Sequence, residues 1–174
     1  MRLYGCIYAF RQVKSKNPMS TDTPAKIQDC MCLAVRQAAR HVTASYDQFL
    51  APAGLRTTQF SILAKLKRQG PMTINALAAD MVMDRTTLGR NILPLERDGL
   101  IRVEPLPSDR RSKALHLTKA GEKRFEAASA GWVKAQARFE SEFGAKRTAE
   151  LRELLRTVVA SELGPQAPSS RLLR

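Results

Sequence analysis

Hydrophobic residues recur at steps of three and four along most of the chain, which is the spacing of one face of an α-helix. In the first half of the chain this pattern predicts helices bounded by capping residues or by turns that contain Gly or Pro. The predicted helices are Ile27–Leu50, a segment from Thr57 or Thr58 to Gly70-Pro71, a short one from Ile74 to about Met81 with Thr73 as its N-cap, and a segment from Asp84 to Asp98-Gly99. Pro94 lies inside the last of these, where it crowds the carbonyl of Arg90, so we expect a bend there.

The pattern then changes from a helical period to alternation, which is typical of strands. Leu100–Glu104 and Lys113–Leu117 alternate apolar and polar residues, and the polar run Pro107–Arg111 separates them. These segments predict a β-hairpin with a basic tip. A long helix capped by Thr118 and running through Phe143 is expected next, and a last helix follows it.

This order of elements is that of a winged helix-turn-helix, in which the hairpin is the wing and the fourth helix enters a DNA groove. Arg can bind guanine O6 and N7 bidentately, and Thr offers a hydroxyl to phosphate and a methyl group to thymine. The candidates for DNA contact in the fourth helix are Arg85, Thr86, Thr87, Arg90 and Asn91, the last pairing with adenine if it faces the groove. A solvated helix face is the alternative, and the capped turn before it and the basic hairpin after it favour DNA contact.

The composition is that of an ordinary soluble globular protein of one domain: 174 residues, 44% hydrophobic and 26% charged. An excess of 29 Lys and Arg over 16 Asp and Glu gives a net charge of +13. This balance favours a polyanionic partner over a merely soluble basic surface. No apolar run reaches the roughly 18 residues of a membrane span, and three cysteines without framework spacing argue against a secreted disulfide scaffold. We therefore expect a cytoplasmic protein that does not bind membranes, and Met19 is a candidate for its natural start.

Several short segments together carry a family resemblance. They are Thr57-Thr58-Gln59-Phe60, Leu77-Ala78, Asp84–Leu88, Leu95–Ile101, Asp109-Arg110-Arg111-Ser112 and Leu117–Gly121. With them, the stretch from Leu55 to Gly121 resembles the MarR family of bacterial and archaeal transcriptional regulators. The resemblance implies an obligate homodimer, built by the first helix and the last two, that binds double-stranded DNA at a pseudo-palindromic operator and usually represses nearby genes.

The resemblance also assigns roles within the wing. It implies that Arg111 reaches into the minor groove while Asp109 orients the wing, and Arg110 joins the DNA-binding residues of the basic tip. Pro94 departs from much of the family, so we expect the far end of the fourth helix to sit in the groove differently from other members.

The apolar stripes of the last two helices, Phe125 to Phe139 and Leu151 to Val159, exceed what one small winged helix needs to bury. A partner subunit is one destination for them, and an intramolecular bundle is the other. The expected organisation is a winged helix-turn-helix flanked by dimerisation helices, mainly α with a small β-hairpin wing. Its parts are a disordered extension 1–24, a dimerisation helix 25–54, the DNA-binding region 55–120, dimerisation helices 121–163 and a tail 164–174.

Cys30 and Cys32 raise the question of an oxidant or metal signal. Side chains two residues apart in a regular helix point in directions about 200° apart, so these two thiols cannot coordinate the same ion there. A disulfide or metal site requires that the helix begin after them, or that each meet a cysteine of the other subunit. The alternative is that each is a small buried hydrophobe.

No other cofactor or metal is expected, because His41 and His116 have no Cys or carboxylate at ligand spacing. The chain has no nucleophile elbow and no phosphate-binding loop, so an enzyme is not expected. The resemblance implies a small aromatic or phenolic ligand, and Tyr46 and Trp132 are candidates to line its pocket unless they are core residues. We predict a DNA-binding repressor released by such a ligand or by an oxidant; the alternative is a winged-helix module that binds protein or RNA.

Overall fold

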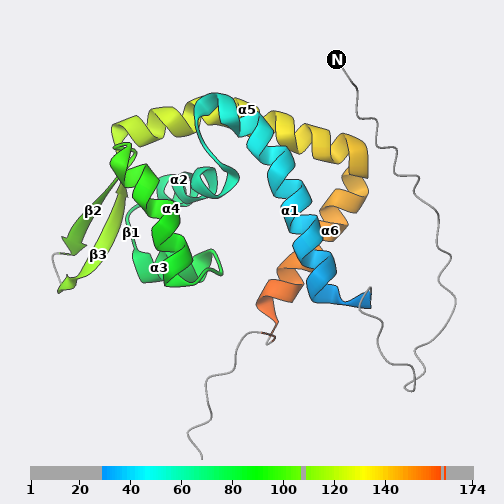
Figure 1. The fold of residues 1–174 in the computed structure, drawn as a ribbon, viewed down its shortest axis with the longest axis horizontal. Coiled ribbons are helices and arrows are strands. Elements are labelled where there is room, and N and C mark those ends of the chain that lie inside the picture. Colours follow the sequence, from blue (N-terminus) through cyan, green and yellow to red (C-terminus); the bar gives the residue numbers. More distant parts are fainter. Residues whose placement is uncertain (1–28, 107–108, 162, 164–174) are drawn as a thin grey trace, which may run out of the picture. The chain divides into compact units, whose positions relative to one another are not determined.

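A computed structural model describes residues 29–106, 109–161 and 163, without the side chains of residues 106 and 109–112. The chain divides into two compact units, Met1–Gln37 and Ala38–Arg174. Its elements are α1 (Met31–Leu50), η2 (Ala51–Ala53), α2 (Thr57–Gln69), β1 (Met72–Thr73), α3 (Ile74–Asp80), α4 (Arg85–Arg97), β2 (Ile101–Leu106), β3 (Asp109–Leu117), α5 (Lys119–Phe143) and α6 (Ala145–Ala160) (Figure 1). The first turns of α1 belong to the first unit, and all later elements belong to the second.

The predicted fold class is confirmed: the described chain is mainly helical, with a small antiparallel sheet that forms the wing. The predicted start of the first helix at Ile27 lies outside the described residues, and within them α1 begins at Met31, after Cys30. Helix α4 continues through Pro94 to Arg97, and the bend at Pro94 stays a prediction. In the described part of the chain, no helix combines the length and the apolar composition needed to cross a membrane.

Three helices begin at the N-caps that the sequence predicts. In each, a side-chain oxygen of the cap accepts a hydrogen bond from a backbone N–H of the first turn, which would otherwise lack a partner. The bonds run from Ala76 N to Thr73 Oγ1 (3.0 Å), from Thr87 N to Asp84 Oδ1 (2.8 Å) and from Gly121 N to Thr118 Oγ1 (3.0 Å).

Helix α2 departs from the prediction that Thr57 or Thr58 caps it. Its N-cap is Arg56, whose backbone N–H donates to Gln59 Oε1 at 2.9 Å. The N–H and hydroxyl of Thr57 both donate to Asp47 Oδ1, at 2.7 and 2.6 Å. The prediction was wrong because the helix starts one residue earlier, with Thr57 as its first residue, and the Thr57 hydroxyl donates to a carboxylate of another helix, α1, instead of accepting from a first-turn N–H.

The sheet has the order β1-β3-β2, so β3 is its central strand. Leu115 pairs with Met72 of β1 on one side and with Val103 of β2 on the other. The β2–β3 pairing is regular as far as Pro105 and shifts before Leu106. The sequence does not predict β1, because a strand of two residues is too short to show alternation.

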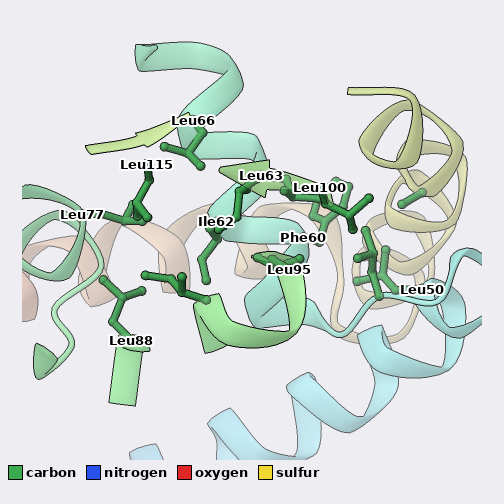
Figure 2. Close-up of a cluster of buried hydrophobic side chains, with 14 of the residues drawn as sticks. Leu50, Phe60, Ile62, Leu63, Leu66, Leu77, Leu88, Leu95, Leu100 and Leu115 are labelled. Carbon is green, nitrogen blue, oxygen red and sulfur yellow. The ribbon is translucent and has the colours of Figure 1, made fainter. Parts of the chain in front are cut away.

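The core lies where α2, α4 and the base of the wing meet (Figure 2). Leu88, Ile92 and Leu95 form the buried face of α4, as the helical spacing predicts. Helix α2 buries Phe60, Ile62, Leu63 and Leu66, because it contacts α4 on one side and α5 on another. The fully buried large side chains are Leu50, Ile62, Leu63, Leu77, Leu88, Leu95, Ile101 and Leu115.

Two glycines of α5 allow other backbone segments to approach it. A Cβ on Gly121 would collide with the carbonyl oxygen of Leu100, directly before β2, and one on Gly131 would collide with that of Phe49 in α1. The first contact places the start of α5 against the wing, and the second lets the C-terminal part of α1 pack on α5.

Candidate nucleic-acid interface

Helices α3 and α4 are joined by a tight turn with a left-handed residue at its centre. Val82 has φ 51°. Its N–H donates to the carbonyl of Ala79 at 3.1 Å, and the N–H of Met83 donates to that of Ala78 at 2.9 Å. This pair of bonds is the Schellman motif, which usually has Gly at the left-handed position. The turn sets the direction in which α4 leaves α3.

The start of α4 is held by Asp84. The Thr87 hydroxyl and then the Thr87 backbone N–H are the main hydrogen-bond donors that hold the pKa of the Asp84 carboxyl below its ordinary value. A carboxylate here also favours the positive end of the helix dipole. Thr87 therefore serves the cap, although the sequence suggests it as a DNA contact.

The outward face of α4 carries Thr86 and Arg90. At about 100° per residue, both lie on the side of the helix opposite Leu88 and Ile92. Arg85 lies on a flank of the same helix, and all three candidates are exposed. Among the described residues, neither Arg85 nor Arg90 has a carboxylate within ion-pair distance, whereas Arg97 pairs with Asp98 at 3.0 Å.

Asn91 lies on the other flank and is half-buried. Its Nδ2 donates to the carbonyl of Thr87 at 2.8 Å, one turn earlier in the same helix. Together with Arg56, Arg90 and Pro94 it lines a polar groove between α4 and the start of α2.

Sequence reasoning missed one residue of the outward face, Leu93, which is 64% exposed. Its position is out of phase with the buried stripe of Leu88, Ile92 and Leu95. That mismatch is a signal that the sequence itself carries. An apolar side chain on a helix that enters the major groove can contact the methyl group of thymine.

The wing supplies the second predicted contact. Asp109, Arg110 and Arg111 lie in β3, and Asp109 pairs with Leu106 at the end of β2, but their side chains lie outside the description. Further down the hairpin, Glu104 lies 3.1 Å from Arg102 Nε and 3.5 Å from His116 Nε2. Because Asp109 pairs at the far end of β2 while Ile101 and Leu115 near the base belong to the core, the predicted basic residues lie at the end of the hairpin away from the core.

A cavity of about 640 Å³ lies beside the helix-turn-helix, against α2 and α5. The Phe60 ring stacks on Phe125 at 5.0 Å and on Trp132 at 6.2 Å between centroids. Tyr46 also lines it; its hydroxyl donates to Gln136 Oε1, and burial raises its pKa above the ordinary value. The two aromatic residues singled out in the sequence, Tyr46 and Trp132, therefore border a cavity and are not fully buried in the core.

The cysteine candidates lie at the start of α1. Cys30 precedes the helix and Cys32 is in its first turn, and both are exposed. Within the described ranges, no group of three or more His, Cys, Asp or Glu side chains is placed to hold a metal ion.

Comparison with known proteins places this geometry in a family. Residues 55–113 match the sequence model of the MarR family. An uncharacterized HTH-type transcriptional regulator of Bacillus subtilis, YwoH, is 29% identical over 109 residues, which are 63% of this chain and 79% of that protein. The homoprotocatechuate degradative operon repressor of Escherichia coli is 26% identical over 135 residues, covering 77% of this chain and 90% of the repressor.

A solved structure extends the likeness to the whole fold. The M. tuberculosis transcriptional regulator MOSR, in complex with DNA, is 35% identical, with a TM-score of 0.66 and coverage of 77% of this chain and 99% of that one. The matches span the helix-turn-helix, the wing and the flanking helices. The chain belongs to the MarR family of transcriptional regulators.

Proposed function

We propose that the protein is a homodimeric repressor that binds a pseudo-palindromic operator and leaves it when a small ligand binds. The observation that carries the proposal is the outward face of α4. It presents Thr86 and Arg90 to solvent, and no carboxylate of the described chain lies within ion-pair distance of Arg90. The net charge of +13 favours a polyanion as the partner of this face.

The residues of α4 divide their roles according to their positions on the helix. Arg90 and Thr86 face outward and read base edges, and Arg85 contacts bases or the adjacent phosphate from its flank. Thr87 acts through the cap on Asp84. Asn91 donates its side-chain N–H to the carbonyl of Thr87 in its own helix. In this proposal it lines the polar groove between α4 and α2 and does not pair with adenine.

The wing contacts the minor groove next to the half-site that α4 reads. In this proposal Arg111 inserts into the groove, Arg110 binds phosphate, and Asp109 orients the turn. A narrow minor groove has a strong negative potential that attracts arginine. These contacts add affinity with little base discrimination.

The helices outside residues 55–120 form the dimer in this proposal. The support comes from α6, where aliphatic side chains of the predicted apolar face are exposed. They are Leu154, Leu155, Val158 and Val159. A contiguous apolar face of this kind is stabilised when a second copy covers it.

The proposed ligand is a small aromatic or phenolic molecule held in the cavity of Phe60, Phe125 and Trp132. Stacking of a ligand ring on these side chains removes apolar surface from water, and the Tyr46 hydroxyl offers a polar contact at one end. An oxidant is a second release signal in this proposal, because Cys30 and Cys32 are exposed thiols. Replacing both with Ser tests it: DNA binding of the double variant should no longer weaken in peroxide.

The test is selection of bound duplexes from a random pool, followed by affinity measurements on the enriched sequence. An inverted repeat with half-sites about 10 base pairs apart is expected. Arg90→Ala should lower the affinity and relax the base preference, while Lys146→Ala, which removes the same charge from α6, should change neither. Failure to enrich any sequence, with equal binding to RNA or to no nucleic acid, would contradict the proposal and favour a protein- or RNA-binding module.

A further inference from the structure

Lys65 of α2 belongs both to the aromatic cavity and to an ion pair with α3. It lines the aromatic cavity, and its Nζ lies 2.6 Å from Oδ2 of Asp80, the last residue of α3. Gln69 Nε2 lies 3.5 Å from the same oxygen. The cavity wall is therefore connected directly to the first helix of the helix-turn-helix.

The cavity has a cationic rim and no carboxylate in its lining. Lys65, Lys67 and Arg68 line it from α2, and the rest of the lining consists of aromatic, hydroxyl and small side chains. Lys67 is exposed and also pairs with two carboxylates of α5, at 3.6 Å from Glu122 and 3.3 Å from Glu126. An aromatic ligand that carries a carboxylate thus finds cations at this rim, and Lys65 is the one of the three that is half-buried rather than exposed.

Asp80 needs the Lys65 ammonium because of its place in the fold. A carboxylate in the last turn of a helix faces the negative end of the helix dipole, which is unfavourable unless a cation offsets it. Asp80 also directly precedes the turn of Met81, Val82 and Met83 that sets the direction of α4. A change in its partner therefore acts at the point where α4 is aimed.

We propose that Lys65 couples the cavity to the helix-turn-helix: the carboxylate of an aromatic ligand takes the Lys65 ammonium, and Asp80 loses its partner. The inference rests on the proposed function and names how its ligand is selected and how its signal is passed on. Because the ligand carboxylate and Asp80 compete for one cation, binding of the ligand and the α2–α3 ion pair oppose each other. The same competition lowers ligand affinity whenever Asp80 is ionised.

The experiment uses the full chain and its single tryptophan, Trp132, which borders the cavity and reports binding by fluorescence. The probes are benzoate, cinnamate and 1-naphthoate, each with its neutral amide. In the wild type the best carboxylate should bind more tightly than its amide. Lys65→Gln should reduce that difference and leave amide binding unchanged. If no carboxylate exceeds its amide, or if the Lys65 variant keeps the difference, the proposal is wrong.

Asp80→Asn tests the competition. It should bind the carboxylate up to about fivefold more tightly, the range expected for a partly exposed ion pair. Hydrogen exchange in α3 should rise on addition of the carboxylate in the wild type and stay constant in this variant. The matched control is Glu150→Gln, which removes the partner of Lys146 on α6, outside the cavity lining, and should leave both readings at wild-type values. An unchanged affinity in Asp80→Asn, or the same response in both variants, would overturn the coupling.

The failure of this inference is distinguishable from failure of the proposed function. On the selected duplex, the carboxylate should lower the DNA affinity of the wild type and have no effect on that of Asp80→Asn. A wild type that binds no duplex contradicts the proposed function, and the exchange measurement still decides the coupling. If Asp80→Asn does not fold, shown by its circular dichroism, the Lys65→Gln titration and wild-type exchange decide it.

Discussion

The outward faces of α4 and α6 each expose a leucine to the same extent, yet the side chains around the two leucines differ. Leu93 on α4 is 64% exposed and Leu154 on α6 is 65% exposed. The neighbours of Leu93 on its face are Arg90 and Arg97, whereas Leu154 lies one turn before Val158. Exposure alone therefore does not tell what an apolar residue contacts. The side chains around it distinguish a surface suited to a polyanion from one suited to a second copy of the chain.

The two faces also differ in how they are held. Helix α4 is fixed by the cap at Asp84, by its buried stripe and by the left-handed turn at Val82. Helix α6 contributes a single buried residue, Thr148, to the described unit. A helix with so little buried surface gains most of its stability from whatever covers its apolar face. The comparison predicts that substitutions on α6 act on assembly and that those on α4 act on DNA.

The largest effect is expected from two charges placed on the apolar face of α6. Leu154→Glu with Val158→Glu should produce a monomer at micromolar concentration. Each side chain contributes roughly 1.5–3 kcal/mol on burial, and two-fold symmetry counts each twice, so the dimer dissociation constant should rise at least about a thousandfold. Sedimentation velocity over a concentration series measures it. Lys146→Glu, an exposed charge change on the same helix, should remain dimeric, and a dimeric double variant would contradict the comparison.

The next effect concerns two arginines with different roles in DNA binding. Arg90→Ala should cost about 1–3 kcal/mol per contact and relax the preference at one position in each half-site. Arg111→Ala should weaken all sequences more evenly and make affinity less dependent on salt, because it removes a contact to phosphate and minor-groove potential. Affinities for matched and mismatched duplexes over a salt series separate the two. Unchanged affinity in Arg111→Ala would refute the role given to the wing.

The predictable parts of this molecule are the local ones. The buried stripe of Leu88, Ile92 and Leu95 follows from helical spacing, and the Asp84 cap follows from residue type at a helix start. Both depend on neighbours within one or two turns. The same rules place Thr86 and Arg90 on the outward face.

The parts that could not be predicted depend on residues far apart in the chain. Asp47 lies in a different helix from Thr57, so no local pattern reveals that it satisfies the start of α2. The ion pair of Lys65 with Asp80 is hidden in the same way. The left-handed conformation of Val82 could not be predicted for another reason. Gly usually occupies such a position, and a β-branched residue does not indicate a left-handed turn.

A smaller effect sharpens the comparison with matched leucines. Leu93→Ala should leave the dimer intact and weaken binding only to duplexes with thymine at one position, by about fourfold for a lost methyl contact. Leu154→Ala should leave base preference intact and weaken the dimer. Sedimentation and the duplex panel are measured on both. If both variants shift the same quantity, the two faces do not have separate functions.

The smallest effect tests the turn that aims α4. Val82→Gly should raise the free energy of unfolding by about 0.5–1 kcal/mol, since a left-handed L-residue costs roughly 1–2 kcal/mol and added chain entropy returns about 0.5–1 kcal/mol of it. The side chain is 71% exposed, so little packing is lost. Thermal melting should show a gain of about 1–4 °C, with the affinity for DNA within about twofold of wild type. Val133→Gly, an exposed position inside α5, should lose stability instead, because glycine is unfavourable in a helix interior. A loss in both variants would show that Val82 is not strained, and that α4 is aimed by its packing and its cap rather than by this turn.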